Sequence, residues 1–379
     1  MGTVTLSPSK SSLEGTSSTS LSADRQAQPD FFDFKIQLKI LPIAIGTAGT
    51  VFKVFLQYMG SDPKYSVVIP VYNRPKELDE LLQSLAEQSF RNFEVLIVED
   101  GSKETSQSVY EKYSSILSIQ YFFKPNSGPG PSRNFGFERA KGEYFVVFDS
   151  DCLLPSNYFE TVEKSLASQP LDAWGGPDRG HEKFTPLQQA MAYTMSSVLT
   201  TGGIRGGKNS ALNFQPRSFN MGMSRTVFEK TGGFKFDRLA EDIELSIRIR
   251  KAGFRVGLIP EAFVYHKRRA TLSQFYQQVK GFGAGRARVG KVHPEEIKVT
   301  HWFPFLFLVG LMSIPVIYLF NPWLADAVAV AYFVYFLAIV VDATRSTQSV
   351  AVAILSSAAA LVQLSGYGIG FIREKMKAG

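Results

Sequence analysis

Two aspartates, Asp149 and Asp151, stand two residues apart at the end of the apolar run 144–148 (YFVVF). In an extended chain alternate side chains point the same way, so both carboxylates would lie on one side. Such carboxylates repel each other unless a cation joins them, and a hard divalent ion such as Mg²⁺ or Mn²⁺ prefers oxygen ligands. An ion held there would neutralise the charge on a departing diphosphate. Alone the triplet is a weak signal, because Asp-x-Asp occurs often by chance.

A glycine-rich loop, residues 126–134 (NSGPGPSRN), leads into a helix predicted over about 131–140. Glycines allow close backbone approach, and a helix start offers free N–H groups to an anion. Arg133 would add a fixed cation. The loop matches neither the dinucleotide fingerprint nor a Walker sequence. Taken alone, it is more typical of a structural turn than of a binding site.

A third polar group, residues 239–244 (LAEDIE), begins a periodic helix that we expect to end near Ala252. Acidic residues in a first turn complement the helix dipole, which would account for Glu241 and Asp242 without any function. The alternative is a carboxylate that acts as a general base and deprotonates an acceptor hydroxyl. His266 precedes three cations at 267–269, so it could meet a diphosphate or a metal.

Strands and helices alternate through the region that carries these groups. Apolar, β-forming runs predict four strands, at 66–70, 94–98, 118–123 and 144–148. The alternation predicts an α/β fold with a mostly parallel sheet flanked by helices, and ligands bind such sheets at the carboxyl ends of the strands. Polar or acidic loops follow three of these strands, at 71–74, 99–102 and 149–151.

The ends of the chain differ from this central region, which we assign to residues 62–300. Residues 1–30 are rich in Ser, Thr and Gly and are predicted to be disordered. Residues 31–61 include an apolar stretch interrupted by proline, glycine and lysine, so we interpret it as an interfacial helix. The single cysteine, Cys152, suits a reducing compartment, and no secretory signal is recognisable.

Residues 301–379 are mostly apolar and contain three stretches that would fit membrane spans, at 302–320, 323–341 and 350–372. Buried core helices are the alternative. The net charge is +7, and basic residues are enriched between 267 and 298, just before the tail. Because no nucleic-acid module is recognisable, this pattern favours membrane lipids over nucleic acid as a partner. We expect an integral membrane protein with its globular domain on the cytoplasmic face, as in a bacterial inner membrane.

Three spans would conflict with the positive-inside tendency. They would place Arg373, Lys375 and Lys377 across the membrane from the globular domain. Either one stretch does not span, or the stretch at 40–59 does.

Four motifs in order resemble glycosyltransferase family 2 over about Tyr65–Arg269. They are SVVIPVYNRPKELDELLQSL, VLIVEDGS, SGPGPSRNFGFERAKGEYFVVFDSD and GGF…AEDIELSIRIRKAGFRVGLIPEAFVYH. The resemblance implies the type-A glycosyltransferase fold and a nucleotide-diphosphate sugar donor. The residues that it places around the nucleotide are Pro70, Tyr72, Asp100, Arg133 and Asp149. It places Asp151 on the metal and makes Asp242 the base of an inverting single displacement.

Two departures from the family pattern matter. The segment 275–283 (FYQQVKGFG) lacks the Gln-x-x-Arg-Trp signature of processive members, which favours single-sugar addition. Glu99 precedes Asp100 where many relatives have a second aspartate, a change that we expect to be tolerated.

The sequence therefore predicts a membrane-anchored hexosyl- or N-acetylhexosaminyltransferase that uses a UDP- or GDP-sugar and Mg²⁺ or Mn²⁺. The acceptor would be a glycan or a lipid-linked molecule, as in polysaccharide or glycolipid synthesis. We expect acceptor contacts from Trp174, Asp178 and Glu241, and from the glycine-rich stretch 200–220. The alternatives are a sugar nucleotidyltransferase, a processive polysaccharide synthase and a non-catalytic membrane scaffold.

Overall fold

The computed structural model of the protein describes residues 62–377, except for 180–183, 203–213 and 267–268. The predictions for residues 1–30 and 31–61 lie outside the described residues. The four predicted strands are confirmed as β1 (Tyr65–Val71), β2 (Phe93–Asp100), β3 (Ile119–Lys124) and β4 (Tyr144–Phe148).

A seven-stranded sheet has the order β3-β2-β1-β4-β8-β6-β9. Strands β1 to β4 run parallel to one another. Strand β8 (Asn220–Ser224) is antiparallel to both β4 and β6 (Ala173–Gly175), and β9 (Val256–Leu258) is parallel to β6. The sheet is thus mostly parallel, as predicted. A smaller sheet joins β5 (Cys152–Leu153), β10 (Val264–His266) and β7 (Asp178–Arg179).

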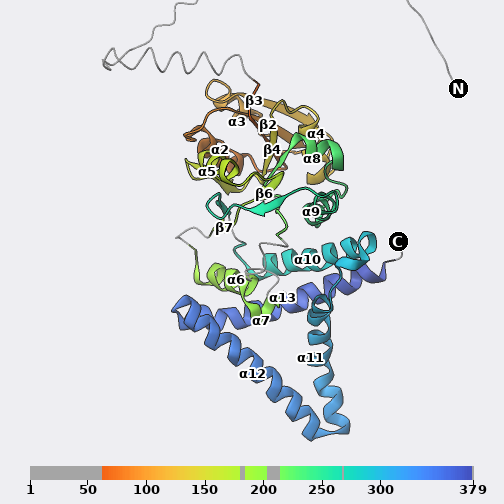
Figure 1. The fold of residues 1–379 in the computed structure, drawn as a ribbon. Coiled ribbons are helices and arrows are strands. Elements are labelled where there is room, and N and C mark those ends of the chain that lie inside the picture. The colour runs from red at the N-terminus through yellow and green to blue at the C-terminus, as the bar shows by residue number, and fades with distance from the viewer. Residues whose placement is uncertain (1–61, 180–183, 203–213, 267–268, 378–379) are drawn as a thin grey trace, which may run out of the picture. The chain divides into compact units, whose positions relative to one another are not determined.

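Helices cover both faces of the large sheet (Figure 1). On one face, α2 (Pro75–Ala86) and α5 (Tyr158–Ser168) pack against the side chains of Val67 and Ile69. On the other face, α4 (Pro129–Phe137) and α9 (Glu241–Lys251) pack against that of Val68. Successive residues of β1 therefore pack into two separate cores, one on each face of the sheet. A strand that is buried on both faces needs a continuous apolar run. Two short helices, α3 (Gln107–Tyr113) and α8 (Arg225–Thr231), complete the domain.

The remaining helices lie in the chain either between β7 and β8 or after β10. They are α6 (Pro186–Ser196), α7 (Val198–Thr201), α10 (Leu272–Val292), the short 3₁₀ turns η2 (Pro294–Glu296) and η3 (Val299–His301), α11 (Phe303–Phe320), α12 (Pro322–Thr347) and α13 (Val350–Met376). The last three helices are long and apolar enough to cross a membrane. Their bounds agree with the three predicted stretches.

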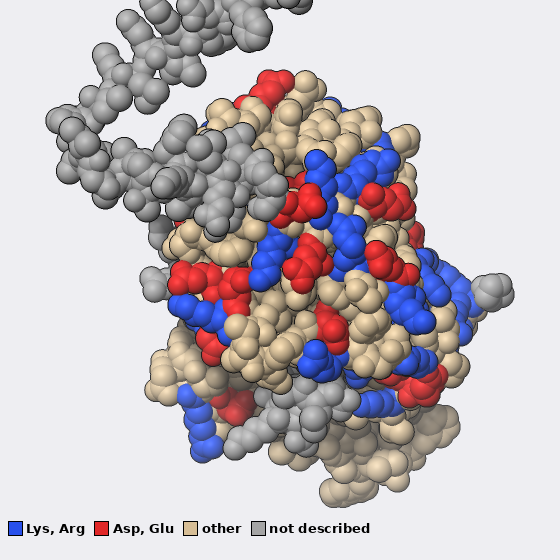
Figure 2. All heavy atoms as spheres, turned by 45° about the horizontal axis from the view of Figure 1, so that its top comes forward, with Lys and Arg blue, Asp and Glu red and all other residues tan. Residues whose placement is uncertain are grey.

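Charges of both signs are distributed over the globular domain. In Figure 2, Lys and Arg side chains are interspersed with Asp and Glu, whereas the part of the view occupied by the tail is almost free of charge. No large single-sign surface is visible on this face.

Candidate active site

The chain leaves β4 at Asp149, where the predicted carboxylate pair lies. The Asp149 side chain is about one third exposed and accepts a hydrogen bond from Arg133 Nη2 at 2.8 Å. Asp151 is nearly buried and pairs with Arg74 Nη1 at 2.5 Å. Each aspartate thus contacts a different arginine.

Arg133 links the end of β4 to the start of α9. Its side chain is 2% exposed, and its Nη1 donates to Glu241 Oε1 at 2.8 Å while Nη2 binds Asp149. Burial opposes the charged form, but the Asp149 and Glu241 carboxylates outweigh it and raise the pKa of Arg133. Its Nε is buried without a hydrogen-bond partner among the described residues. A permanent cation therefore stands between two carboxylates that lie far apart in the sequence.

Asp100 holds the glycine-rich loop in place. Its buried carboxylate accepts from the backbone N–H groups of Ser127 and Gly128, both at 2.9 Å, and pairs with Lys124. Burial would raise the pKa of Asp100, but these donors outweigh it and lower the pKa. Gly130 packs so tightly that an added Cβ would lie 2.0 Å from the Phe236 carbonyl oxygen. The glycines of the loop thus serve packing, the structural alternative raised by the sequence.

Glu241 and Asp242 begin α9 with their side chains turned to different partners. The Glu241 carboxylate binds Arg133 and accepts from Ser218 Oγ at 3.3 Å. Burial and the neighbouring Asp242 raise the pKa of Glu241, although Arg133 opposes them. Asp242 Oδ2 pairs with Arg217 Nε at 2.8 Å and accepts from the Ser218 N–H at 3.2 Å. Glu241 therefore faces the buried arginine, whereas Asp242 faces the segment before β8.

Two arginines near Asp242, Arg217 and Arg286, could not be assigned to the site from the sequence. Arg217 and Asp242 are distant in the chain and belong to no shared periodic pattern. Arg286, on α10, is the second cation; burial and the nearby Arg217 lower its pKa, although Tyr367 opposes this effect. The region around Asp242 is therefore more basic than the sequence indicates.

The ends of β1 and β2 are tied together beside the site. Asn73, with a left-handed φ of 54°, donates from its N–H to Ser102 Oγ at 2.7 Å and accepts from the Lys103 N–H at 2.8 Å. Glu99 is buried and accepts from the Ser106 N–H at 2.8 Å. Pro70 is the last residue but one of β1, and Tyr72, just after the strand, is 48% exposed, so its ring can contact a ligand.

The residues predicted to contact the acceptor differ in their exposure. Trp174 is wholly buried in the core, where its ring packs against Tyr65 and Tyr144 at 6.4 and 5.5 Å. This burial contradicts the predicted acceptor contact, because an aromatic residue in a central strand faces the core. Asp178 is partly exposed in β7 beside β10. The His266 side chain, a candidate metal ligand, lies outside the described residues.

The described side chains fit a divalent cation that is shared with a substrate. Asp151 and Asp149 offer hard carboxylate oxygens, and Mg²⁺ commonly takes one or two carboxylates together with substrate phosphates and waters. Among the described residues, no group of three or more His, Cys, Asp or Glu side chains converges. The described part of the chain would therefore supply one or two ligands, and the substrate and water would supply the others.

The match to a known family extends over most of these elements. Residues 66–232 match Glycosyl transferase family 2. This part of the chain is a family 2 glycosyltransferase domain. The glycosyltransferase domain thus includes β1 to β8, with Asp100, Arg133, Asp149 and Asp151, and confirms the family that the motifs predicted.

Curated relatives match the glycosyltransferase domain over part of its length. An uncharacterized glycosyltransferase of Rickettsia bellii is 39% identical over 105 residues, which is 28% of this chain and 15% of the relative. The poly(ribitol-phosphate) β-N-acetylglucosaminyltransferase TarS of Staphylococcus aureus is 41% identical over 92 residues, which is 23% of this chain and 16% of TarS. The match thus spans less than a fifth of the length of either relative.

A solved structure confirms the fold. The mannosyltransferase PcManGT of Pyrobaculum calidifontis, in complex with GDP-Man and Mn²⁺, aligns with a TM-score of 0.57 at 17% identity. The alignment covers 83% of this chain and 96% of PcManGT. The glycosyltransferase domain therefore has the type-A glycosyltransferase fold, as predicted.

Proposed function

We propose that this protein transfers a single sugar, with inversion, from a nucleotide-diphosphate sugar to an acceptor hydroxyl at a membrane surface. The observation that carries the proposal is the buried Arg133 bridge between Asp149 and Glu241. Arg133 joins the end of β4 to the start of α9. The family resemblance places the nucleotide at the first position and the general base at the second. Residues 62–300 would form the catalytic domain.

Asp242 would act as the general base of this reaction. Its carboxylate accepts a hydrogen bond from the Ser218 N–H and pairs with Arg217, so two contacts fix its position at the start of α9. Glu241 is a weaker candidate, because Arg133 and Ser218 occupy the carboxylate. Glu241 would instead hold Arg133 in place.

The donor side would use the residues at the ends of β1, β2 and β4. Tyr72 and Pro70 would border the base, Asp149 the ribose, and Arg133 would keep this edge electropositive. Asp100 would act through the loop that it holds. When bound, Mg²⁺ or Mn²⁺ would supply positive charge to the leaving diphosphate, and Asp151, beside Asp149, would hold it.

The donor would be a UDP- or GDP-sugar, with a hexose or an N-acetylhexosamine transferred. A glycan or lipid-linked acceptor agrees with the apolar tail, and Asp178 of β7 remains a candidate acceptor contact. The site would face the cytoplasm at a bacterial inner membrane, in polysaccharide or glycolipid synthesis. The three apolar helices and the basic residues before them support this location.

The variant Asp242→Asn tests the proposal. It keeps the shape of the side chain but removes the basic oxygen, so turnover should fall by about 10²–10⁴-fold with donor affinity little changed. Turnover is measured at saturating acceptor, and donor affinity by calorimetry. The matched control is Asp237→Asn. Asp237 lies in the loop before α9, and its exposed carboxylate pairs with Arg288 of α10. Equal losses of turnover and donor affinity would make Asp242 a binding residue, and no loss would place the base elsewhere.

A further inference from the structure

Helices α11 and α12 form an antiparallel hairpin. A single residue, Asn321, separates them. Near the start of α11, the Phe307 ring packs against Tyr332 and Tyr335 of α12 at 5.0 and 5.7 Å, and Tyr332 Oη donates to the Phe307 carbonyl at 2.7 Å. The start of α11 and the end of α12 therefore lie at the same, open end of the hairpin.

Helix α13 crosses this open end instead of running along the hairpin (Figure 1). Two residues, Gln348 and Ser349, separate it from α12. Its C-terminal part reaches the start of α11, where Phe371 packs on Trp302 at 5.2 Å and an added Cβ at Gly368 would lie 2.8 Å from the Pro304 carbonyl oxygen. A third span would bring the end of α13 to the Asn321 turn instead.

Glycines allow close contact between α13 and α10, the first helix after β10. An added Cβ at Gly283 of α10 would lie 2.1 Å from the Tyr367 carbonyl oxygen, and one at Gly370 of α13 would lie 2.0 Å from the Lys280 carbonyl oxygen. Near the ends of both helices, Lys291 Nζ donates to the Lys377 carbonyl at 2.9 Å. The two helices thus run parallel and in contact over several turns.

Burial separates α13 from the other two apolar helices. In its most apolar window 44% of α13 is buried, compared with 6% for α11 and 11% for α12. The buried residues of α13 include the polar Ser356 and Gln363. A helix that packs on a protein layer through one face and is apolar on the other is typical of a membrane interface.

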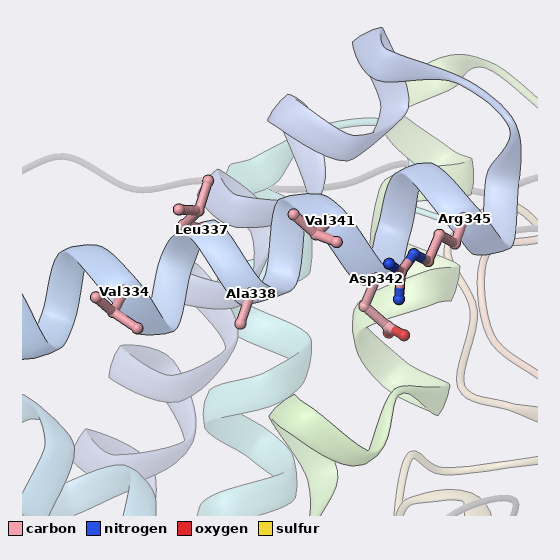
Figure 3. Close-up of a pocket in the computed structure, with 6 residues that line it drawn as sticks. All are labelled: Val334, Leu337, Ala338, Val341, Asp342 and Arg345. Carbon is pink, nitrogen blue, oxygen red and sulfur yellow. The ribbon is translucent and has the colours of Figure 1, made fainter.

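The end of α12 indicates where the membrane surface lies. A groove of about 400 Å³ runs along α12 beside Val334, Leu337, Ala338 and Val341, and ends at Asp342 and Arg345 (Figure 3). Asp342 accepts a hydrogen bond from Tyr193 of α6 at 2.5 Å. The charged turns at the end of α12 therefore lie beside α6, and α13 starts at that level.

We propose that only the α11–α12 hairpin crosses the membrane and that α13 lies along its surface, between α10 and the lipid. Arg373, Lys375 and Lys377 then lie on the same side as the glycosyltransferase domain, where they would contact anionic lipid headgroups. This arrangement satisfies the positive-inside tendency that three spans would violate. It does not depend on the proposed sugar transfer.

Cysteine labelling in sealed, uniformly oriented membranes tests the topology. Reporter cysteines are placed at Ala167 of the glycosyltransferase domain, at Lys377, and in a short polar insertion between Asn321 and Pro322. The parent chain is the unlabelled control, because its single cysteine, Cys152, is buried. An impermeant maleimide should modify Ala167→Cys and Lys377→Cys from one side and the insertion from the other. Labelling of Lys377→Cys from the side of the insertion, or of all three from one side, would overturn the proposal.

Depth measurements with nitroxide labels supply an independent test. Ile354 and Leu361 are exposed on α13, and Val330 and Leu337 form a matched pair with the same spacing on α12. Seven residues of helix rise about 10 Å, so the α12 labels should differ in depth by up to about that much. The α13 labels should lie at nearly the same shallow depth. A depth difference on α13 as large as that on α12 would show that α13 spans.

Discussion

Gly285 of α10 lies against Ala240, the residue that precedes Glu241 and Asp242. An added Cβ at Gly285 would lie 2.9 Å from the Ala240 Cβ. Ala240 has a left-handed φ of 63°, a strained conformation for a residue with a side chain. The packing of α10 therefore helps to hold the turn that presents both acidic residues to the site.

The variant Gly285→Ala should displace this turn and lower turnover, because a shift of about 1 Å in a catalytic group can cost on the order of a hundredfold. Donor affinity should change little, since Asp149 and Tyr72 are on other elements. Gly281→Ala is the matched control, because its added Cβ would meet only the flexible end of Leu239 at 3.3 Å. Steady-state kinetics and calorimetry compare the two. Equal turnover of both variants would contradict the positioning role.

Loss of Arg133 should affect stability as well as donor binding. The change Arg133→Met leaves the buried Glu241 carboxylate without its cation, and breaking a buried pair costs about 3–5 kcal/mol. Chemical denaturation of the purified chain measures the free energy of unfolding. The double variant Arg133→Met/Glu241→Gln should recover part of the stability but not the donor affinity. A double variant as unstable as the single one would show that Glu241 does not depend on Arg133.

The parts of the fold that could be predicted are those that depend on local patterns. The run 144–148 is buried on both faces of the sheet, so its composition alone marks a strand. The contacts of Arg133 with Asp149 and Glu241 join residues far apart in the sequence, and the family resemblance linked only Arg133 and Asp149 to one site. Arg217 is a surface-type residue in a loop, and no periodicity links it to Asp242.

One error of sequence interpretation has a clear physical cause. Apolar composition shows that a side chain avoids water. It does not show whether the side chain then contacts the protein core, a ligand or lipid. Trp174 was expected at the acceptor and instead packs in the core. In the same way, the composition of α13 fits a span but does not reveal that this helix packs against α6 and α10.

His301, just before α11, should make stability fall in mild acid. Its Nδ1 accepts the Lys298 N–H at 2.9 Å, and burial, with the nearby Arg286 and Lys298, lowers its pKa from 6.5 to about 4. Since the unfolded chain then binds the proton more readily, stability should decrease as the pH falls from about 6.5 to about 4. The full effect is on the order of 3 kcal/mol.

The control for this pH effect is His301→Asn, whose amide oxygen can accept the same N–H but does not titrate. Denaturation midpoints of both proteins are measured from pH 7 to pH 4 in one detergent. The wild type should lose more stability than the variant across this interval. Parallel curves would mean that His301 titrates alike in the folded and unfolded states.

Asp151→Asn should weaken metal-dependent donor binding and abolish turnover. Changes to residues that merely support a metal ligand typically cost 10–100-fold in affinity, so loss of a ligand should cost more than about tenfold. Nucleotide affinity is titrated against Mg²⁺ and Mn²⁺. Arg74→Ala serves as comparison, because it removes the cation that pairs with Asp151 and should preserve or strengthen the metal dependence. Full activity of Asp151→Asn, or of the wild type in excess chelator, would refute the metal role.

Removal of α13 should disturb the glycosyltransferase domain as well as its attachment. Phe275 and Val279 of α10 and Met191 of α6 are almost fully buried, in a cluster that α13 completes. A chain that ends at Gln348 exposes them, so α10 should lose order beside Ala240. We therefore expect a lower unfolding temperature and loss of turnover. A chain that ends at Glu374 retains this buried cluster, loses only the Lys291–Lys377 hydrogen bond, and should behave as the wild type. If the shorter chain kept the wild-type unfolding temperature and turnover, α13 would serve attachment alone.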